Sequence, residues 1–275
     1  MSTTLTHMAL HVCDLEASLD FYKGWGDMVD VSPLADQKSP WLSSRGDEGK
    51  FALVLVPGAT KPGKTVPDCD PEPKTCLGFS VETKQRLKQI YNQVAAKAPI
   101  VQAYEETADG ARASFRVEDP NGYVVEFWTS AQAAMQTRLH NVALQSRNMT
   151  VSRDFYEDWG DMHVLLYGKT TQSCRLVSND SDVRALQLIL SGSAAEAATE
   201  EACVDVRDVS HMGFAVDSRE ELEEIYKRAK ANDLVTVDMV DMDAPAGTLF
   251  FMRDPDGYTV EFSYGQPLGA GYGPS

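Results

Sequence analysis

The segment LTHMALHVCDLEASLDFY (residues 5–22) opens the chain and returns in altered form as RLHNVALQSRNMTVSRDFY (residues 138–156). Two further pairs of segments repeat in the same order: CLGFSVETKQRLKQIYNQVAAKA (76–98) with HMGFAVDSREELEEIYKRAKAND (211–233), and RVEDPNGYVVEFWTS (116–130) with FMRDPDGYTVEFSYG (251–265). Ordered internal similarity of this kind indicates a repeated structural unit. The sequence therefore predicts two tandem domains, 4–130 and 138–265, with a linker at 131–137 and a tail at 266–275.

Each half divides once more, because a strand-like run with alternating apolar residues, then a helix, then further strands occur twice within it. In the first module we predict a helix near 14–23 with Asp14 as its N-cap, and strands around 28–32, 41–45 and 51–56. The proline-rich stretch 57–74 is predicted to be a linker, since proline cannot donate to a sheet. The chain is thus expected to be an α+β protein of four βαβββ modules.

Composition excludes several classes of function. With 43% hydrophobic and 24% charged residues the chain resembles a soluble globular protein, and no apolar run is long enough to cross a membrane. A formal charge of −16 disfavours nucleic acid and anionic lipid as partners, because phosphate binding needs clustered Lys and Arg. The start of the chain lacks the pattern of a secretory signal, so we expect a cytoplasmic location. A small-molecule partner is expected, and a homo-oligomer is left open.

Two carboxylates lie inside strands that are otherwise apolar. Glu126 and Glu261 each come four residues after the glycine of an Asp-Pro-Asx-Gly turn. Turn chemistry explains the proline and the glycine but not the carboxylate. An unpaired carboxylate among Val and Phe neighbours costs several kcal/mol, so we expect a metal or a hydrogen-bond partner. Exposure on an edge strand is the alternative.

These motifs resemble the vicinal oxygen chelate superfamily, which includes glyoxalases, fosfomycin-resistance proteins and extradiol ring-cleaving dioxygenases. The resemblance rests on H-M-A-L-H-V-x-D-L-x-x-S-x-x-F-Y, on HMGF and on DPDGYTVEF, and it covers residues 4 to 265. It implies that pairs of βαβββ modules curl into half-barrel cups that hold a divalent metal, with ligands on first and last strands. His7, His211 and Glu261 occupy ligand positions of the family. The position equivalent to His211 in the first half is Cys76, which we interpret as degenerate.

The first strand of the third module raises a question of register. When the two Asp-Phe-Tyr segments are aligned without gaps, His7 corresponds to Asn141 and not to His140. Because side chains alternate along a strand, we expect His140 to point to the opposite face and not to bind metal. A β-bulge at this point is the alternative.

Module pairing decides whether one complete site forms. Pairing in sequence order would combine His7 with Cys76, and His211 with Asn141. Pairing the first module with the fourth, as in some two-domain proteins that the sequence resembles, brings together His7, His211 and Glu261 and leaves the other cup empty. Two histidines and a carboxylate form the facial triad of non-haem Fe(II) oxygenases. We therefore predict first-with-fourth pairing and one Fe²⁺ site, with Mn²⁺, Zn²⁺ and Ni²⁺ as alternative metals.

The ligand set leads to a prediction of function. A fourth ligand, present in glyoxalase-type relatives, is missing because its approximate position is Val54. We predict a non-haem Fe(II)-dependent dioxygenase that cleaves the ring of a catechol- or hydroquinone-type aromatic with O₂. The alternatives are a metal-dependent glyoxalase-type isomerase, lyase or thiol transferase, and a non-catalytic small-molecule-binding protein. As catalytic residues we predict His11 as acid/base and Arg253 as the partner of an anionic substrate. A structural role is the alternative for each.

Overall fold

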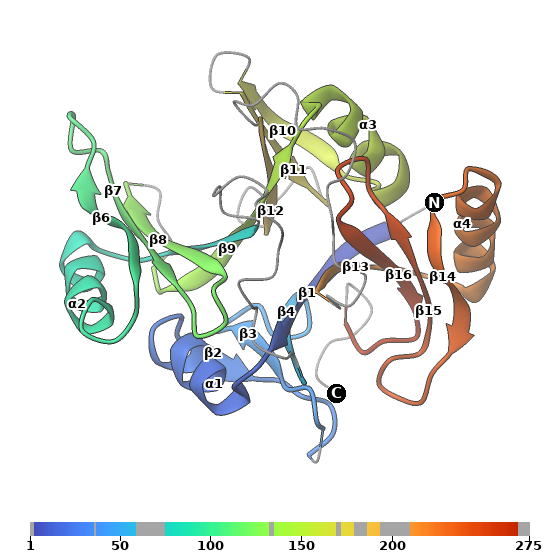
Figure 1. Ribbon diagram of the computed structural model, residues 1–275, viewed down its shortest axis with the longest axis horizontal. Coiled ribbons are helices and arrows are strands. Elements are labelled where there is room, and N and C mark those ends of the chain that lie inside the picture. Colours follow the sequence, from blue (N-terminus) through green and yellow to red (C-terminus); the bar gives the residue numbers. More distant parts are fainter. Residues whose placement is uncertain are drawn as a thin grey trace.

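The computed structural model describes residues 3–35, 37–58, 75–131, 135–168, 172–178, 186–192 and 210–268. Most of the linker predicted at 57–74, part of the linker predicted at 131–137 and most of the tail lie outside these residues. The described strands form two mixed eight-stranded sheets, which we name sheet A and sheet B, and helices pack against both (Figure 1). The predicted α+β class with four βαβββ modules is confirmed.

Sheet A joins the first module to the fourth. Its order is β14 (Val235–Asp241), β15 (Thr248–Arg253), β16 (Thr259–Tyr264), β13 (His211–Val216), β1 (Thr3–Val12), β4 (Ala52–Pro57), β3 (Trp41–Ser44) and β2 (Met28–Asp30). The two first strands, β1 and β13, are antiparallel neighbours at its centre, blue beside orange in Figure 1. The predicted pairing of the first module with the fourth is therefore confirmed.

Sheet B joins the second module to the third in the same way. Its order is β10 (His163–Gly168), β11 (Ser173–Val177), β12 (Gln187–Gly192), β9 (Arg138–Ser146), β5 (Thr75–Ser80), β8 (Val124–Ser130), β7 (Arg112–Glu118) and β6 (Ile100–Glu106). Here β5 and β9 are the central antiparallel pair. The two sheets are thus related by the sequence repeat, strand for strand.

Each sheet has a core face and an open face. On the core face of sheet B, Phe79, Phe115 and Phe127 are fully buried, and their rings stack across neighbouring strands with centroids 5.3 Å apart. We call the opposite side of each sheet its open face. Because side chains alternate along a strand, residues next to these aromatics, such as Ser114 and Glu126, belong to the open face.

The helices α1 (Leu15–Gly24), α2 (Lys84–Val94), α3 (Met149–Gly160) and α4 (Arg219–Ala231) cover the core faces. Helix α1 begins after Asp14, whose side chain accepts from a first-turn backbone N–H, as the sequence predicts. Its Tyr22 ring stacks on Phe79 of sheet B, although α1 belongs to the first module. Helix α3 contacts sheet A in the matching way, with Tyr156 stacked on Phe214. One continuous hydrophobic core therefore joins both sheets.

The Phe-Tyr segments and the Asp-Pro-Asx-Gly turns of the sequence repeats contact each other in the fold. The hydroxyl of Tyr22 donates to Asp119 (2.8 Å), and the hydroxyl of Tyr156 donates to Asp254 (2.7 Å). Each aspartate is the first residue of an Asp-Pro-Asx-Gly turn, and burial raises the pKa of Asp254 to about 6. The Phe-Tyr segment of one module thus holds the turn of the next, which links modules that are neighbours in sequence but lie in different sheets.

Both odd-numbered modules carry a β-bulge in their first strand. The register between β1 and β13 shifts between Leu5 and His7, so Thr6 is the extra residue. The register between β9 and β5 shifts at the equivalent point, and His140 is the extra residue. A bulge bends the strand and re-aims the side chains beside it. It therefore determines which way residues 6–7 and 140–141 point. No helix in the described ranges is long and apolar enough to cross a membrane.

Candidate metal centre

Three side chains of sheet A bring their donor atoms together. His7 comes from β1, His211 from β13 and Glu261 from β16. The two Nε2 atoms are 3.3 Å apart, and the glutamate oxygens lie 3.7 Å from Nε2 of His7 and 3.2 Å from Nε2 of His211. Within the described ranges this is the one group of His, Cys, Asp or Glu side chains with the spacing of a metal site. The three predicted metal ligands therefore lie in one cluster.

The spacing and the donor types suit a divalent ion. Ligands at about 2.1 Å from a shared ion lie about 3.0–3.4 Å from one another, close to the separations observed here. Two imidazole nitrogens and one carboxylate also form the facial set that leaves coordination positions open. The geometry thus fits a metal held by these three residues.

The local sequence explains how His7 reaches this position. In the register of β1 with β13, His7 lies opposite Gly213, the glycine of HMGF. A Cβ atom on Gly213 would lie 1.9 Å from the His7 ring, so only glycine leaves room for the imidazole. The motif glycine therefore provides the space that the first-strand histidine occupies.

Two further side chains orient the ligands. The hydroxyl of Thr6 lies 3.2 Å from Nδ1 of His7 and donates to the carbonyl of Gly213 at 3.2 Å. Because that hydroxyl proton is already used, Nδ1 of His7 must be the donor, which leaves the Nε2 lone pair for the metal. Gln266 donates from Nε2 to Oε1 of Glu261 at 2.8 Å. Both contacts are second-sphere supports of the type that holds metal ligands in place.

Burial gives the cluster its electrostatic character. Only 3% of His7 and 3% of Glu261 is exposed. Burial, modified by Glu261 and His211, lowers the pKa of His7 to about 4, so the imidazole is neutral at neutral pH. Burial opposes ionisation of Glu261, but the two histidines and Gln266 outweigh it and hold its pKa well below the usual range. In the described part of the chain no Lys or Arg pairs with this carboxylate, whose neighbours are the two histidines at 3.7 and 3.2 Å. A buried anion beside the neutral imidazole of His7 is a site that a cation completes.

The cluster lies at the wall of a cavity of about 280 Å³ on the open face of sheet A. The cavity is lined by His7, Ala9, Gln37, Lys38, Ser39, Trp41, Val54, Val56, His211, Pro245, Ala246, Leu249, Glu261 and Gln266. Glu261 pairs with Gly213, two residues after His211, and Val54 pairs with Ala9, two residues after His7. Val54 is therefore the equivalent of Glu261 in the first module, as predicted, and this position carries no carboxylate.

Sheet B presents Asn141 and Glu126 at two of the equivalent positions, while the side chain of Cys76, the equivalent of His211, lies outside what the structure describes. Asn141 lies opposite Gly78 as His7 lies opposite Gly213, and Glu126 pairs with Gly78 as Glu261 pairs with Gly213. Glu126 is in an ion pair with Arg112, with Nη2 and Oε1 3.0 Å apart. An arginine thus neutralises the carboxylate whose counterpart in sheet A is left for a cation.

The expected orientation of His140 is wrong. Its ring packs edge-on against Trp128, with centroids 5.0 Å apart, and Trp128 lies two residues after Glu126 on the open face of sheet B. The bulge in β9 overrides simple alternation and turns His140 toward the same face as Asn141. His140 nevertheless lies in sheet B, away from the triad of sheet A.

The structure places the two predicted catalytic residues at the ends of strands. His11 is partly exposed four residues beyond His7 in β1, and Arg253 is exposed at the end of β15. Neither lines the cavity. Their catalytic roles stay predictions. Sequence reasoning did not find Thr6 or Gln266, because a neutral residue carries no signal of its own. Gln266 even falls in the predicted tail.

Comparison with known proteins places the chain in a family. The model of the Glyoxalase/Bleomycin resistance protein/Dioxygenase superfamily matches residues 4–127 and 138–262. The chain belongs to this superfamily, and the resemblance predicted from its motifs is confirmed. The two matched segments are its tandem glyoxalase domains, while the exact boundaries 4–130 and 138–265 stay a prediction.

Comparison with individual proteins identifies a shared fold but does not identify a reaction. An uncharacterised protein of Pseudomonas aeruginosa is 32% identical over 139 residues, which are 50% of this chain and 95% of that protein. Glyoxalase I from Zea mays has a TM-score of 0.68 at 17% identity, over 95% of this chain and 92% of that one. A putative dioxygenase from Bacillus subtilis has a TM-score of 0.59 at 13% identity, over 96% and 86%. At such low identity these structures show a common fold alone.

Proposed function

We propose that this protein is a non-haem Fe(II)-dependent dioxygenase that opens the ring of a catechol- or hydroquinone-type aromatic with O₂. The observation that carries the proposal is the ligand set of three donors, with Val54 where a fourth carboxylate would stand. Three protein ligands leave room for a chelating substrate and for O₂. A fourth carboxylate would instead favour glyoxalase-type chemistry.

The cavity supports an aromatic substrate. Trp41, Val54 and Leu249 supply apolar walls, and these side chains are buried or nearly so. Lys38 and Gln37 lie on the loop before β3 and offer polar contacts on one side. Apolar walls with a few polar groups are typical of small-molecule sites. This lining holds a flat ring against the ligand cluster and excludes water around it.

The protein groups around the metal ligands act by holding protons and orientations. Thr6 fixes the His7 tautomer, and Gln266 keeps one oxygen of Glu261 engaged. The chemistry that iron supplies when bound is acidification of a ligated hydroxyl and electron transfer between the ring and O₂. His11 as proton carrier and Arg253 as the contact for an anionic substituent are proposed to act from the ends of β1 and β15, outside the cavity lining.

The test is metal analysis of anaerobically purified protein together with oxygen uptake on catechols and hydroquinones. Glu261→Gln should abolish iron-dependent uptake. Glu126→Gln, its equivalent in sheet B, is the matched control and should retain uptake. Turnover of a substrate without oxygen consumption, for example the hemithioacetal of methylglyoxal and glutathione, would replace this proposal with an isomerase or lyase. Absence of a bound metal would favour a binding protein.

A further inference from the structure

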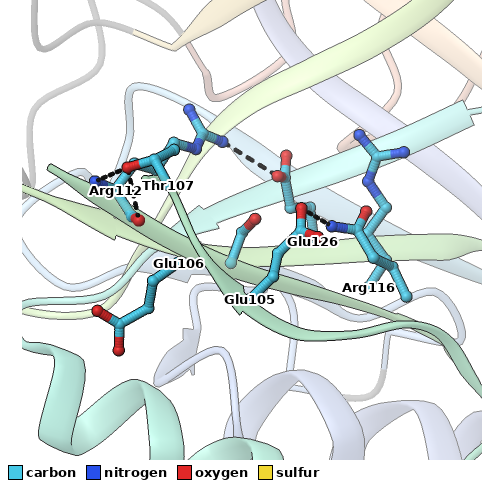
Figure 2. Close-up of a pocket in the computed structure, with 8 residues that line it drawn as sticks. Glu105, Glu106, Thr107, Arg112, Arg116 and Glu126 are labelled. Carbon is cyan, nitrogen blue, oxygen red and sulfur yellow. Dashed lines mark hydrogen bonds and ion pairs between the residues drawn. The ribbon is translucent and has the colours of Figure 1, made fainter. Parts of the chain in front are cut away.

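The open face of sheet B holds a second cavity, of about 480 Å³, that the metal chemistry does not use. It is lined by Gln102, Glu105, Glu106, Thr107, Arg112, Ser114, Arg116 and Glu126. Figure 2 shows Arg112 and Arg116 projecting from the same strand on either side of Glu126. Its lining shares two positions with the cavity of sheet A, since Glu126 corresponds to Glu261 and Ser114 to Leu249, but Asn141, the counterpart of His7, does not line it.

The charges of this cavity are unevenly compensated. Glu126 is neutralised by Arg112, and Glu106 forms ion pairs with Lys84 and Lys88 on α2. Arg116 has no acidic partner within the described residues, and its Nε is buried without a hydrogen-bond acceptor. In a chain of net charge −16, an arginine left without an anion inside a cavity calls for an explanation.

A second donor on the same face is also unused. Trp128 is 92% buried, since only 8% is exposed, and its Nε1 has no acceptor among the described residues. Its register partner on β7 is Ser114, and Arg116 is the register partner of Glu126. The guanidinium of Arg112 lies over the Trp128 ring at 4.7 Å from its centroid, so this ring is a wall of the arginine cluster. Two N–H donors without an acceptor thus lie on the same face of β7 and β8, although Trp128 itself is not part of the cavity lining.

Further arginines lie next to the cavity, although Arg138 is paired with Asp47 at 2.8 Å and Arg112 with Glu126 at 3.0 Å. Burial and the charges of Arg138, Arg175 and Arg112, in that order, lower the pKa of His140 to about 4. His140 packs on Trp128, so these cations lie on the same open face. The lining itself carries Glu105, Glu106 and Glu126 against two arginines, so the attraction for an anion is local to the unpaired Arg116 and is not a property of the whole surface.

We propose that this cavity is a metal-free binding site for a small organic monocarboxylate. The carboxylate is held by the fork of Arg116, because a guanidinium matches two carboxylate oxygens. Ser114 and Gln102 line the same cavity and can serve hydroxyl or carbonyl groups of the ligand. Glu105 and Glu126 disfavour a dianion such as phosphate, since like charges would be brought close together. This site is independent of the metal and of the proposed oxygenase activity.

The experiment uses full-length, metal-free protein and benzoate as the probe, followed by calorimetric titration at pH 7. Benzamide, the neutral analogue, and inorganic phosphate are the comparison ligands. Arg116→Met should weaken benzoate binding by about tenfold or more, since hydrogen bonds to a charged group contribute about 1.5–3 kcal/mol. Arg116→Lys should keep part of the affinity. Arg45→Met, on an exposed loop, and Glu261→Gln, in the other cavity, should bind benzoate as the wild type does.

Any of the following results would overturn the proposal: no saturable benzoate binding, equal binding of benzamide, unchanged benzoate binding in Arg116→Met, or loss of binding in Glu261→Gln. Tighter binding of phosphate than of benzoate would also contradict it. The thermal unfolding of each variant is measured first. If Arg116→Met does not fold, the comparison of wild type with Arg116→Lys decides, and equal benzoate affinity of those two proteins refutes the role of the arginine fork.

Discussion

Replacing Thr6 by valine tests whether the hydroxyl of Thr6 orients His7 for metal binding. The hydroxyl of Thr6 is fully buried and lies 3.2 Å from Nδ1 of His7. Valine keeps the shape but leaves Nδ1–H unsatisfied in a ring that is 3% exposed, at a cost of about 1–3 kcal/mol. The ring can relieve this cost by moving its proton to Nε2, the atom that would bind the metal. We therefore expect metal affinity to fall by about 10–100-fold, the usual effect of losing a second-sphere partner.

The assay is competition between the protein and a chromophoric chelator for Zn²⁺, and for Fe²⁺ without oxygen. Thr6→Ser keeps the hydroxyl and should bind metal much as the wild type does, which separates loss of the hydrogen bond from a change of packing. Unchanged metal affinity in Thr6→Val would refute the reasoning, as would equal losses in the valine and serine variants.

Three further predictions concern the triad, the helix contacts and the second sheet. We expect one tightly bound divalent ion per chain by elemental analysis, lost in His7→Ala and retained in His140→Ala, because the two histidines lie in different sheets. Tyr156→Phe should lower the free energy of unfolding in urea by about 1–3 kcal/mol, because it removes a donor from buried Asp254. The pKa of His140 lies at about 4 in the folded protein, below the value of 6.5 for an unperturbed histidine. Its contribution to stability is therefore fully present above pH 6.5, and it should fall by about 2–3 kcal/mol as the pH drops toward 4, relative to His140→Gln.

Each of these has an outcome that contradicts it. Two ions bound with similar affinity would mean that the cup of sheet B also holds metal. If Tyr156→Phe is as stable as the wild type, the hydrogen bond between Tyr156 and Asp254 does not stabilise the fold. A parallel acid dependence of wild type and His140→Gln, measured by urea unfolding between pH 7 and 4, would show that His140 does not titrate in this range.

The sequence predicted most of the fold because repetition carries topological information. The repeats defined four modules, and the complete ligand set was obtainable only if the first module paired with the fourth. The structure has that pairing in sheet A. Asp14 as a helix cap and Val54 as the empty fourth position were also read correctly. All of these depend on local chemistry or on alignment of one repeat with another.

What only the tertiary structure decided lies in irregular backbone and in neutral neighbours. Strand alternation alone predicted the wrong face for His140, because a bulge inserts one extra residue into β9. The composition of β9 does not indicate this bulge. The importance of Thr6 and Gln266 appeared only when β1, β13 and the end of the chain met around Glu261. The role of Arg112 also appeared only in the structure, where its guanidinium lies beside Glu126 in the place that a metal ion would take in sheet A. A sequence determines which residue types are present and how the repeats align. Whether a buried carboxylate faces an arginine or an open cation site is decided by side chains from distant strands, because charge compensation acts through space and not along the chain.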